Sequence, residues 1–198
     1  MTVANSEISP IARLAIAYAR VDLRPAFALL LGFDNRLSEI VGRASEPMIA
    51  QMKIAWWNDA IASEPSARPK GEPVFQALSE LTVPGVDAAT QQLLDAWGLL
   101  LSVDDWTTEV LDSFAETRSL AIFGSFAAWV GSDDDVSTVG KAWALADLRL
   151  RFGTRMVGGQ TPASYMRTTR ILRPLSILAF SVTEPSGVRM IWHALTGR

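Results

Sequence analysis

The fold of this chain is decided by residues 24–61, RPAFALLLGFDNRLSEIVGRASEPMIAQMKIAWWNDAI, which predict two long helices joined by a short turn. The first helix has a wide apolar stripe, and the second ends in the pair Trp56-Trp57. Polar side chains interrupt the apolar surface of the first helix: Asp34, Asn35, Arg36, Ser38, Glu39 and Arg43. Polar residues at helical spacing on such a surface usually face something, and a bound ligand and solvent are both left open.

Helix signals continue along the rest of the chain. Ser9-Pro10 starts a helix to about residue 20, and the proline-rich residues 63–73 form a loop. Further helices are expected at about 73–81, from 87, from 104 or 105 to 130, at 136–152, towards 172 and up to 197. No alternating strand pattern is longer than a few residues. We therefore expect an all-α, single-domain helical bundle of about eight to nine helices over residues 1–198.

The second helix of the opening stretch has apolar residues on much of its surface. We expect its buried side to be the one that carries Met48, Met52, Ala55 and Trp56 and continues to Ile61. This orientation would place the paired tryptophans against the first helix of the stretch.

Composition excludes several kinds of site. The 198 residues include no cysteine and a single histidine, His193, so there is no disulfide, thiolate ligand, cysteine nucleophile or zinc site built from histidine pairs. We expect His193 to cap or pack near the end of the last helix. The chain has no secretory signal and no apolar run of the ~20 residues that a membrane span needs. We expect a cytoplasmic protein without a transmembrane segment, and peripheral contact with the inner membrane is left open.

Charge is distributed unevenly along the chain. Residues 1–148 carry 20 acids and 10 bases, a balance of −10, whereas residues 149–198 carry one acid and 8 arginines, a balance of +7. The basic end could bind phosphates or anionic lipid, but we favour its docking on the acidic surface of the same chain. Because the arginines are thinly spread and no aromatic-basic module is visible, we expect no nucleic-acid partner.

Four carboxylates follow one another at helical spacing. Asp105, Glu109, Asp112 and Glu116 fall at i, i+4, i+7 and i+11, which puts them on one helix face. Such a row could hold magnesium, which prefers oxygen ligands. We favour a solvated acidic face, the commoner role of such a row.

Three segments, in this order and spacing, resemble one protein family. They are residues 24–41, EPMIAQMKIAWWNDAI (46–61) and GKAWALADLRLRF (140–152). Together they are similar to the squalene/phytoene synthase family. The resemblance implies an all-α fold of the isoprenoid-synthase type. It also implies enzymes that join two prenyl diphosphates head to head, with aspartate-rich motifs on facing helices that hold magnesium and diphosphate.

Both aspartate-rich motifs are incomplete in this chain. When Phe33 is laid on the family's phenylalanine, Ser38, Glu39 and Gly42 stand where the first motif has its aspartates. The second motif keeps Asp147 and continues with arginines. The resemblance thus implies Glu39 and Asp147 as candidate metal ligands. The candidate catalytic residues are Asp34, Glu39 and Asp147. The candidate substrate-binding residues are Arg24, Phe33, Arg36, Trp57 and Arg151.

The pattern of losses decides between the hypotheses. A divergent branch of the family contains a mitochondrial assembly factor for respiratory complex I. It resembles this chain at residues 46–61 and at FAETRSLAIFGSFAAWVG (114–131), and it also lacks a complete set of aspartates. We therefore expect a binding or assembly factor without prenyl transfer or a cofactor, with a membrane-associated protein complex as its partner. The alternatives are a magnesium-dependent prenyl diphosphate transferase with a reduced metal site, and a prenyl-lipid binder without chemistry.

Overall fold

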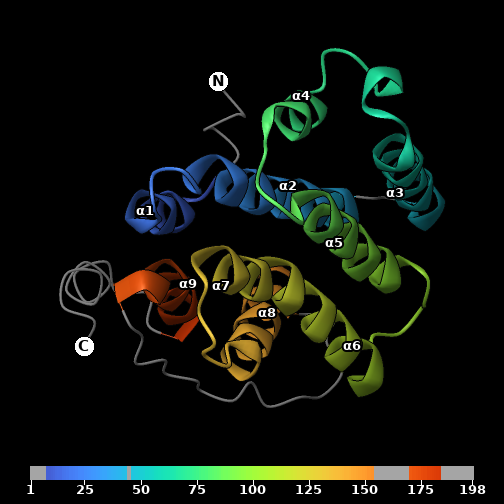
Figure 1. The fold of residues 1–198 in the computed structure, drawn as a ribbon. Helices are drawn as coiled ribbons and strands as arrows, with labels where there is room; N and C mark the ends of the chain where they lie inside the picture. Colours follow the sequence, from blue (N-terminus) through green and yellow to red (C-terminus); the bar gives the residue numbers. More distant parts are fainter. Residues whose placement is uncertain (1–7, 44–45, 154–169, 184–198) are drawn as a thin grey trace.

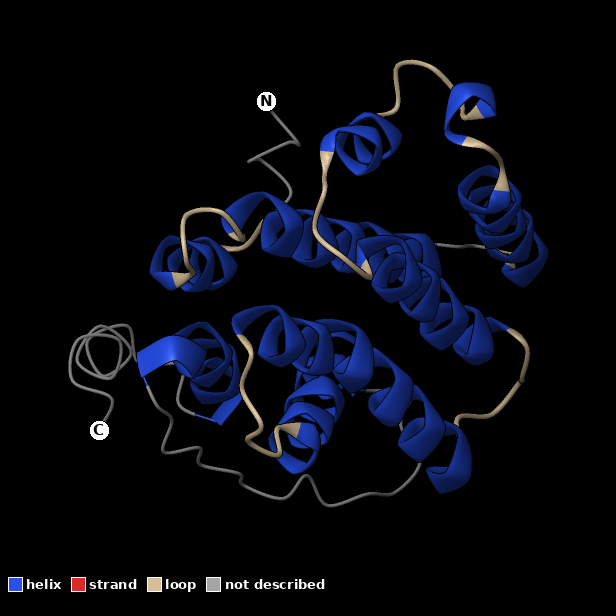
Figure 2. Ribbon diagram, in the orientation of Figure 1, coloured by secondary structure: helices blue, strands red, loops and turns tan. Residues whose placement is uncertain are grey.

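The computed structural model describes residues 8–43, 46–153 and 170–183, and this part of the chain is built from helices without a strand (Figures 1 and 2). The α-helices are α1 (Pro10–Tyr18), α2 (Arg24–Arg43), α3 (Pro47–Ala62), α4 (Pro73–Glu80), α5 (Val86–Leu101), α6 (Thr108–Ser119), α7 (Ser125–Val130), α8 (Ser137–Phe152) and α9 (Arg173–Thr183). Short turns η1 (Pro65–Ala67) and η4 (Arg170–Leu172) and the π-helical turn η2 (Leu120–Gly124) complete the described elements. The predicted all-α architecture is confirmed.

Local sequence explains several helix boundaries. The Ser9 hydroxyl accepts a hydrogen bond from the Ala12 amide at 3.2 Å and Pro10 follows it, so α1 begins where the sequence predicts. Gly131 ends α7 with a φ of +69°, in the left-handed region that glycine adopts without strain. The expected helices before residue 170 and after residue 186, and His193, lie outside the described residues.

The long helix predicted from residue 104 or 105 to 130 is present as one continuous run of α6, η2 and α7. Counting this run as one helix gives eight in the described part of the chain, as expected. It packs closely against α8 at Gly140. A Cβ added there would collide with the Ser119 hydroxyl and lie 3.0 Å from the Phe123 ring. The glycine therefore allows the two helices that carry the central site to approach each other.

Helix α2 lies at the centre of the bundle. In Figure 1, α2 and α5 cross the middle of the view, α6 to α9 lie below them, and α3 and α4 lie at the upper right edge. α1 packs on α9, so the first and last described helices meet. The α2 side chains of Phe27, Leu29, Leu30, Phe33 and Leu37 are completely buried. No described helix has the length and apolar character needed to cross a membrane.

The predicted orientation of α3 is wrong. Met48 and Met52 are 69% and 67% exposed, Trp56 is 46% exposed, and Ala55 is also exposed. The buried side of α3 instead carries Ala50, Trp57, Ala60 and Ile61. Because α3 has apolar residues on almost every side, their spacing could not identify the side that packs against α2 and α5.

Candidate functional site

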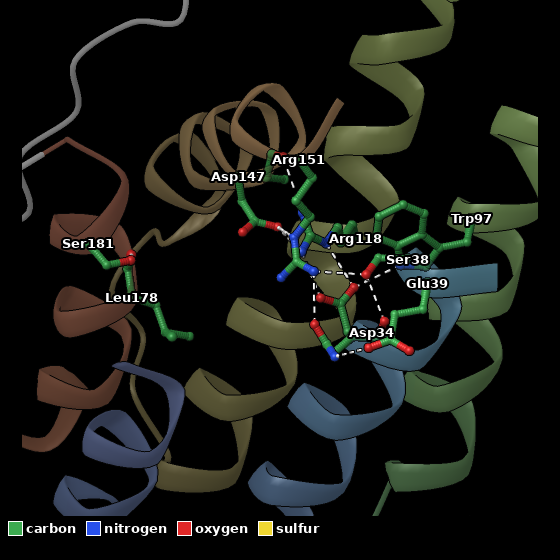
Figure 3. Close-up of polar contacts among 11 residues, drawn as sticks. Asp34, Ser38, Glu39, Trp97, Arg118, Asp147, Arg151, Leu178 and Ser181 are labelled. Carbon is green, nitrogen blue, oxygen red and sulfur yellow. Dashed lines mark hydrogen bonds and ion pairs between the residues drawn. The ribbon is translucent and has the colours of Figure 1, made fainter. Parts of the chain in front are cut away.

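The centre of the bundle is occupied by the guanidinium group of Arg118, which extends from α6 and is completely buried. Its Nε donates to Asp34 Oδ1 at 2.8 Å and its Nη2 to Asp34 Oδ2 at 2.6 Å, a bidentate ion pair with α2 (Figure 3). Nη2 also donates to Asp147 Oδ2 on α8 at 2.6 Å, and Nη1 donates to the Ala144 carbonyl at 3.2 Å. One arginine thus joins the two helices that carry the candidate aspartates.

Aromatic rings enclose this arginine. The guanidinium carbon of Arg118 lies 4.2 Å from the centre of the Trp143 ring and 5.2 Å from that of Trp97. The Trp97 indole N–H donates to Asp34 Oδ1 at 2.8 Å, so Asp34 accepts from two different elements. Because the rings exclude water and attract the cation, these contacts strengthen the ion pairs.

The network continues from Asp147 to Arg151 on the same helix. Arg151 Nε donates to Asp147 Oδ2 at 2.9 Å, and its Nη1 donates to Asn35 Oδ1 at 2.9 Å and Ser38 Oγ at 2.8 Å. Arg151 is an arginine of the basic end of the chain, and it binds the body intramolecularly, as predicted for that end. Two arginine charges therefore face the two aspartate charges, and the centre has no net charge.

The pKa values follow from burial and these neighbours. Burial acts to lower the pKa of Arg118, but the charges and hydrogen bonds of Asp34 and Asp147 outweigh it and hold the pKa above its usual range. Burial acts to raise the pKa of Asp147, but Arg118 and Arg151 outweigh it and hold the pKa below its usual range. Arg118 and Asp147 are both charged at neutral pH, so neither can act as a proton donor or acceptor there.

Glu39, the other candidate metal ligand, lies at the edge of this network. Its Oε1 accepts from Asn35 Nδ2 at 3.2 Å, and its Oε2 lies 3.4 Å from Arg43 Nη1. The hydrogen-bonded path from Glu39 to Asp147 passes through Asn35 and Arg151. The structure therefore places both predicted ligands in one network but separates them by an amide and a guanidinium group.

The candidate substrate-binding residues lie in three different places. Arg24 donates to the carbonyls of Ala17 and Ala19 at 2.7 and 3.0 Å and so holds the end of α1. Phe33 and Trp57 are buried and in contact, with ring centres 5.0 Å apart.

The remaining arginines of that set face different surroundings. Arg36 lies 3.3 Å from Glu72 and over the Trp57 ring, whereas Arg151 belongs to the central network. The structure brings Asp34, Asp147 and Arg151 together and leaves Arg24 and Arg36 apart from them.

The acidic row at 105–116 has the solvated character that we favoured. Asp105, Glu109, Asp112 and Glu116 are all exposed, and Asp105 precedes the first residue of α6. Glu116 pairs with Lys141 of α8 at 3.2 Å. The row is a surface feature of α6 and does not face the centre of the bundle.

Sequence reasoning missed Arg118, the central residue of the site. A signal was present, because Arg118 follows Leu111, Phe114 and Ala115 at the spacing of the buried stripe of α6. A charged residue at such a position must have a partner inside the protein. The two aspartates already identified on facing helices were the available partners.

The residues at the centre do not fit a magnesium ion. Magnesium needs near-octahedral oxygen ligands and keeps several waters, whereas both aspartates here accept hydrogen bonds from a guanidinium group that fills the space between them. Within the described ranges no group of three or more histidine, cysteine or acidic side chains is placed to hold a metal.

Comparison with known proteins adds the family. The family model of squalene/phytoene synthase matches residues 11–116, more than half of the chain, from α1 to within α6. The match includes Asp34 and Glu39 and ends two residues before Arg118. No curated protein and no solved structure matches the chain. The matched helices and the all-α architecture agree with the isoprenoid-synthase fold of that family, so the chain belongs to the squalene/phytoene synthase family.

Proposed function

We propose that this chain is a member of its family without prenyl transfer, and that it acts as a binding or assembly factor. The observation that carries the proposal is the guanidinium group of Arg118 between Asp34 and Asp147. It already takes up the negative charge and the oxygen lone pairs that a metal-bound diphosphate would require. The alternative, a magnesium-dependent prenyl diphosphate transferase, would need Arg118 to leave a completely buried place and take its charge with it.

The partner that we propose is a membrane-associated protein complex, with a respiratory complex as the specific candidate. Support comes from the resemblance of residues 46–61 and 114–131 to the assembly-factor branch of the family, since the second segment contains Arg118 itself. A cytoplasmic location at the inner membrane fits such a role. A prenyl lipid in the centre of the bundle is less well supported, because Arg118, Trp97 and Trp143 fill the space beside the aspartates.

A diphosphate-release assay tests the loss of prenyl transfer. The purified chain is incubated with farnesyl or geranylgeranyl diphosphate and magnesium, and released diphosphate is measured against a protein-free blank. We expect no release above the blank. Release that disappears in both Glu39→Ala and Asp147→Ala would overturn the proposal in favour of the transferase.

The assembly role has its own test in the native host. Cells lacking the chain should accumulate less of the assembled respiratory complex, measured by native gel electrophoresis. Expression of the wild type should restore it, and so should Glu39→Ala, because the Glu39 side chain is partly exposed and outside the closed part of the network. Unchanged assembly in cells that lack the chain would count against this role.

A further inference from the structure

The exposed apolar side of α3 has no partner within the described chain. Met48, Met52 and Trp56 are spaced at i, i+4 and i+8, and Ile49 lies beside them at 44% exposure. These four side chains form one continuous strip, which we call the α3 strip. Large apolar side chains scattered singly on a surface are ordinary, but a strip of four on one helix marks a surface that is covered when the protein functions.

Trp56 is held in a fixed orientation within the α3 strip. Its ring centre lies 5.1 Å from that of Trp57 and 5.9 Å from that of Phe75, while about half of the side chain remains exposed. A tryptophan with a buried base and an open edge matches the water–lipid interface, where its indole ring is favoured. The strip therefore has the apolar length and the aromatic anchor of an interfacial helix.

The charges beside the α3 strip are positive in balance. A groove of about 810 Å³ between α2 and α3 is lined by the strip and by the cations Arg36, Arg43 and Lys53. Its two carboxylates are Glu39, which pairs with Arg43 at 3.4 Å, and Glu72, which pairs with Arg36 at 3.3 Å. One positive charge remains in excess, in a chain whose residues 1–148 have a balance of −10. Because charges are screened beyond ~8 Å at physiological ionic strength, this local excess determines what approaches α3.

The position of α3 suits a broad partner surface. Figure 1 shows α3 at the outer edge of the bundle, away from α6 to α9. We propose that the α3 strip docks this protein on an anionic phospholipid bilayer, with Met48, Met52 and Trp56 in the interface and Lys53 towards lipid phosphates. This inference deepens the proposed function, on which it rests, by naming the surface that meets the membrane.

Vesicle co-sedimentation of the full chain tests the apolar contribution. We expect binding to phosphatidylcholine vesicles that contain phosphatidylglycerol, and Met52→Asp should weaken it about tenfold or more, because a charge replaces an inserted side chain. The matched control is Leu150→Asp on α8, since Leu150 is 71% exposed but distant from α3 in the sequence and fold. Equal loss in both variants, or no binding by the wild type, would overturn the proposal.

A second pair of variants tests the charge. Lys53→Glu should weaken binding to vesicles with phosphatidylglycerol several-fold and leave binding to pure phosphatidylcholine vesicles nearly unchanged. Lys141→Glu on α8 changes the net charge by the same amount, and we expect it to have little effect. Equal weakening by the two variants would show a response to net charge alone and would contradict the assigned surface.

The outcomes separate this inference from the proposed function. Vesicle binding needs no protein partner and no catalysis, so diphosphate release in the assay above would leave the vesicle result intact. If vesicles do not bind but Met52→Asp abolishes assembly of the respiratory complex in the host, the α3 strip is a protein-docking surface. The bilayer proposal would then be wrong while the assembly role stands.

Discussion

Helix α2 presents one carboxylate to each of two very different regions. Asp34 faces the centre of the bundle, where Arg118 and Trp97 bind both of its oxygens. Glu39, five residues later, faces the groove beside α3, where it is partly exposed and paired only with exposed Arg43 and with Asn35. The central region is closed by charge pairing and aromatic rings, whereas the outer groove is open and lined by exposed apolar side chains.

This contrast separates stability from binding within one small fold. In the centre, every charge that we describe has an opposite charge in contact, so the region behaves as a polar core that fixes α2, α6 and α8 together. The groove contributes little to packing but exposes the side chains that a partner surface could cover. Function has thus moved from the inside of the ancestral scaffold to its edge, and each region should respond differently to substitution.

The largest expected effect is that of Arg118→Met. The substitution leaves Asp34 charged and buried without its partner, which should lower the free energy of unfolding by about 3–5 kcal/mol. Urea denaturation monitored by circular dichroism measures the change. Adding Asp34→Asn to the same chain should recover part of the loss, because the unpaired charge is then gone. A loss below about 1 kcal/mol in the single variant would show that the centre is open to water.

Gly140→Ala tests how tightly the central region is packed. The added methyl group would collide with Ser119 on α6, so we expect a loss of about 1–3 kcal/mol in the free energy of unfolding. Gly98→Ala on α5 is the matched control, since a Cβ there would lie 3.5 Å from Ile54, an ordinary contact distance. This control should be neutral or stabilising, because alanine favours a helix over glycine. Equal thermal stability of the two variants would contradict the close approach of α6 and α8.

The pH dependence of stability should come from the same region. The pKa of Asp147 is lowered in the folded protein, so its contribution is present above its unfolded pKa of about 3.9 and is lost as pH falls through the folded value. We expect Asp147→Asn to cost about 1–3 kcal/mol at pH 7 and progressively less below about pH 4. Urea titrations at a series of pH values measure this difference. A difference that is constant down to about pH 2 would argue against a charged Asp147.

The smallest expected effect on stability belongs to the groove. Met52→Asp should change the free energy of unfolding by no more than about 0.5 kcal/mol, because the side chain is already 67% exposed. The same variant should lose vesicle binding, so that binding and stability separate. A destabilisation above about 1.5 kcal/mol would mean that the strip is part of the core.

The fold was largely accessible from the sequence, because caps and breakers are local signals. Ser9 starts α1, Gly131 ends α7, and the run from α6 to α7 continues through Gly124 as predicted. The orientation of α3 was not accessible, because a helix that is apolar on almost every side does not reveal by spacing which side is buried.

The candidate site was accessible only in part. Asp34, Asp147 and Arg151 could be named from the helices that carry them, and they do meet. Arg118 could not be connected with them from the family motifs, since it lies between the two motif segments in the sequence. The pairing of Arg118 with Asp34 joins residues 84 positions apart, a contact that helical periodicity does not predict.

The most direct measurement is the melting temperature of the wild-type chain with and without magnesium and inorganic pyrophosphate. A ligand that binds the native state at a hundred times its Kd adds about 2.7 kcal/mol of stability, which for a protein of this size corresponds to roughly 5–11 °C. Because Arg118 already occupies the space between the aspartates, we predict no increase. An increase of several degrees that depends on magnesium and disappears in Asp147→Asn would contradict the closed centre.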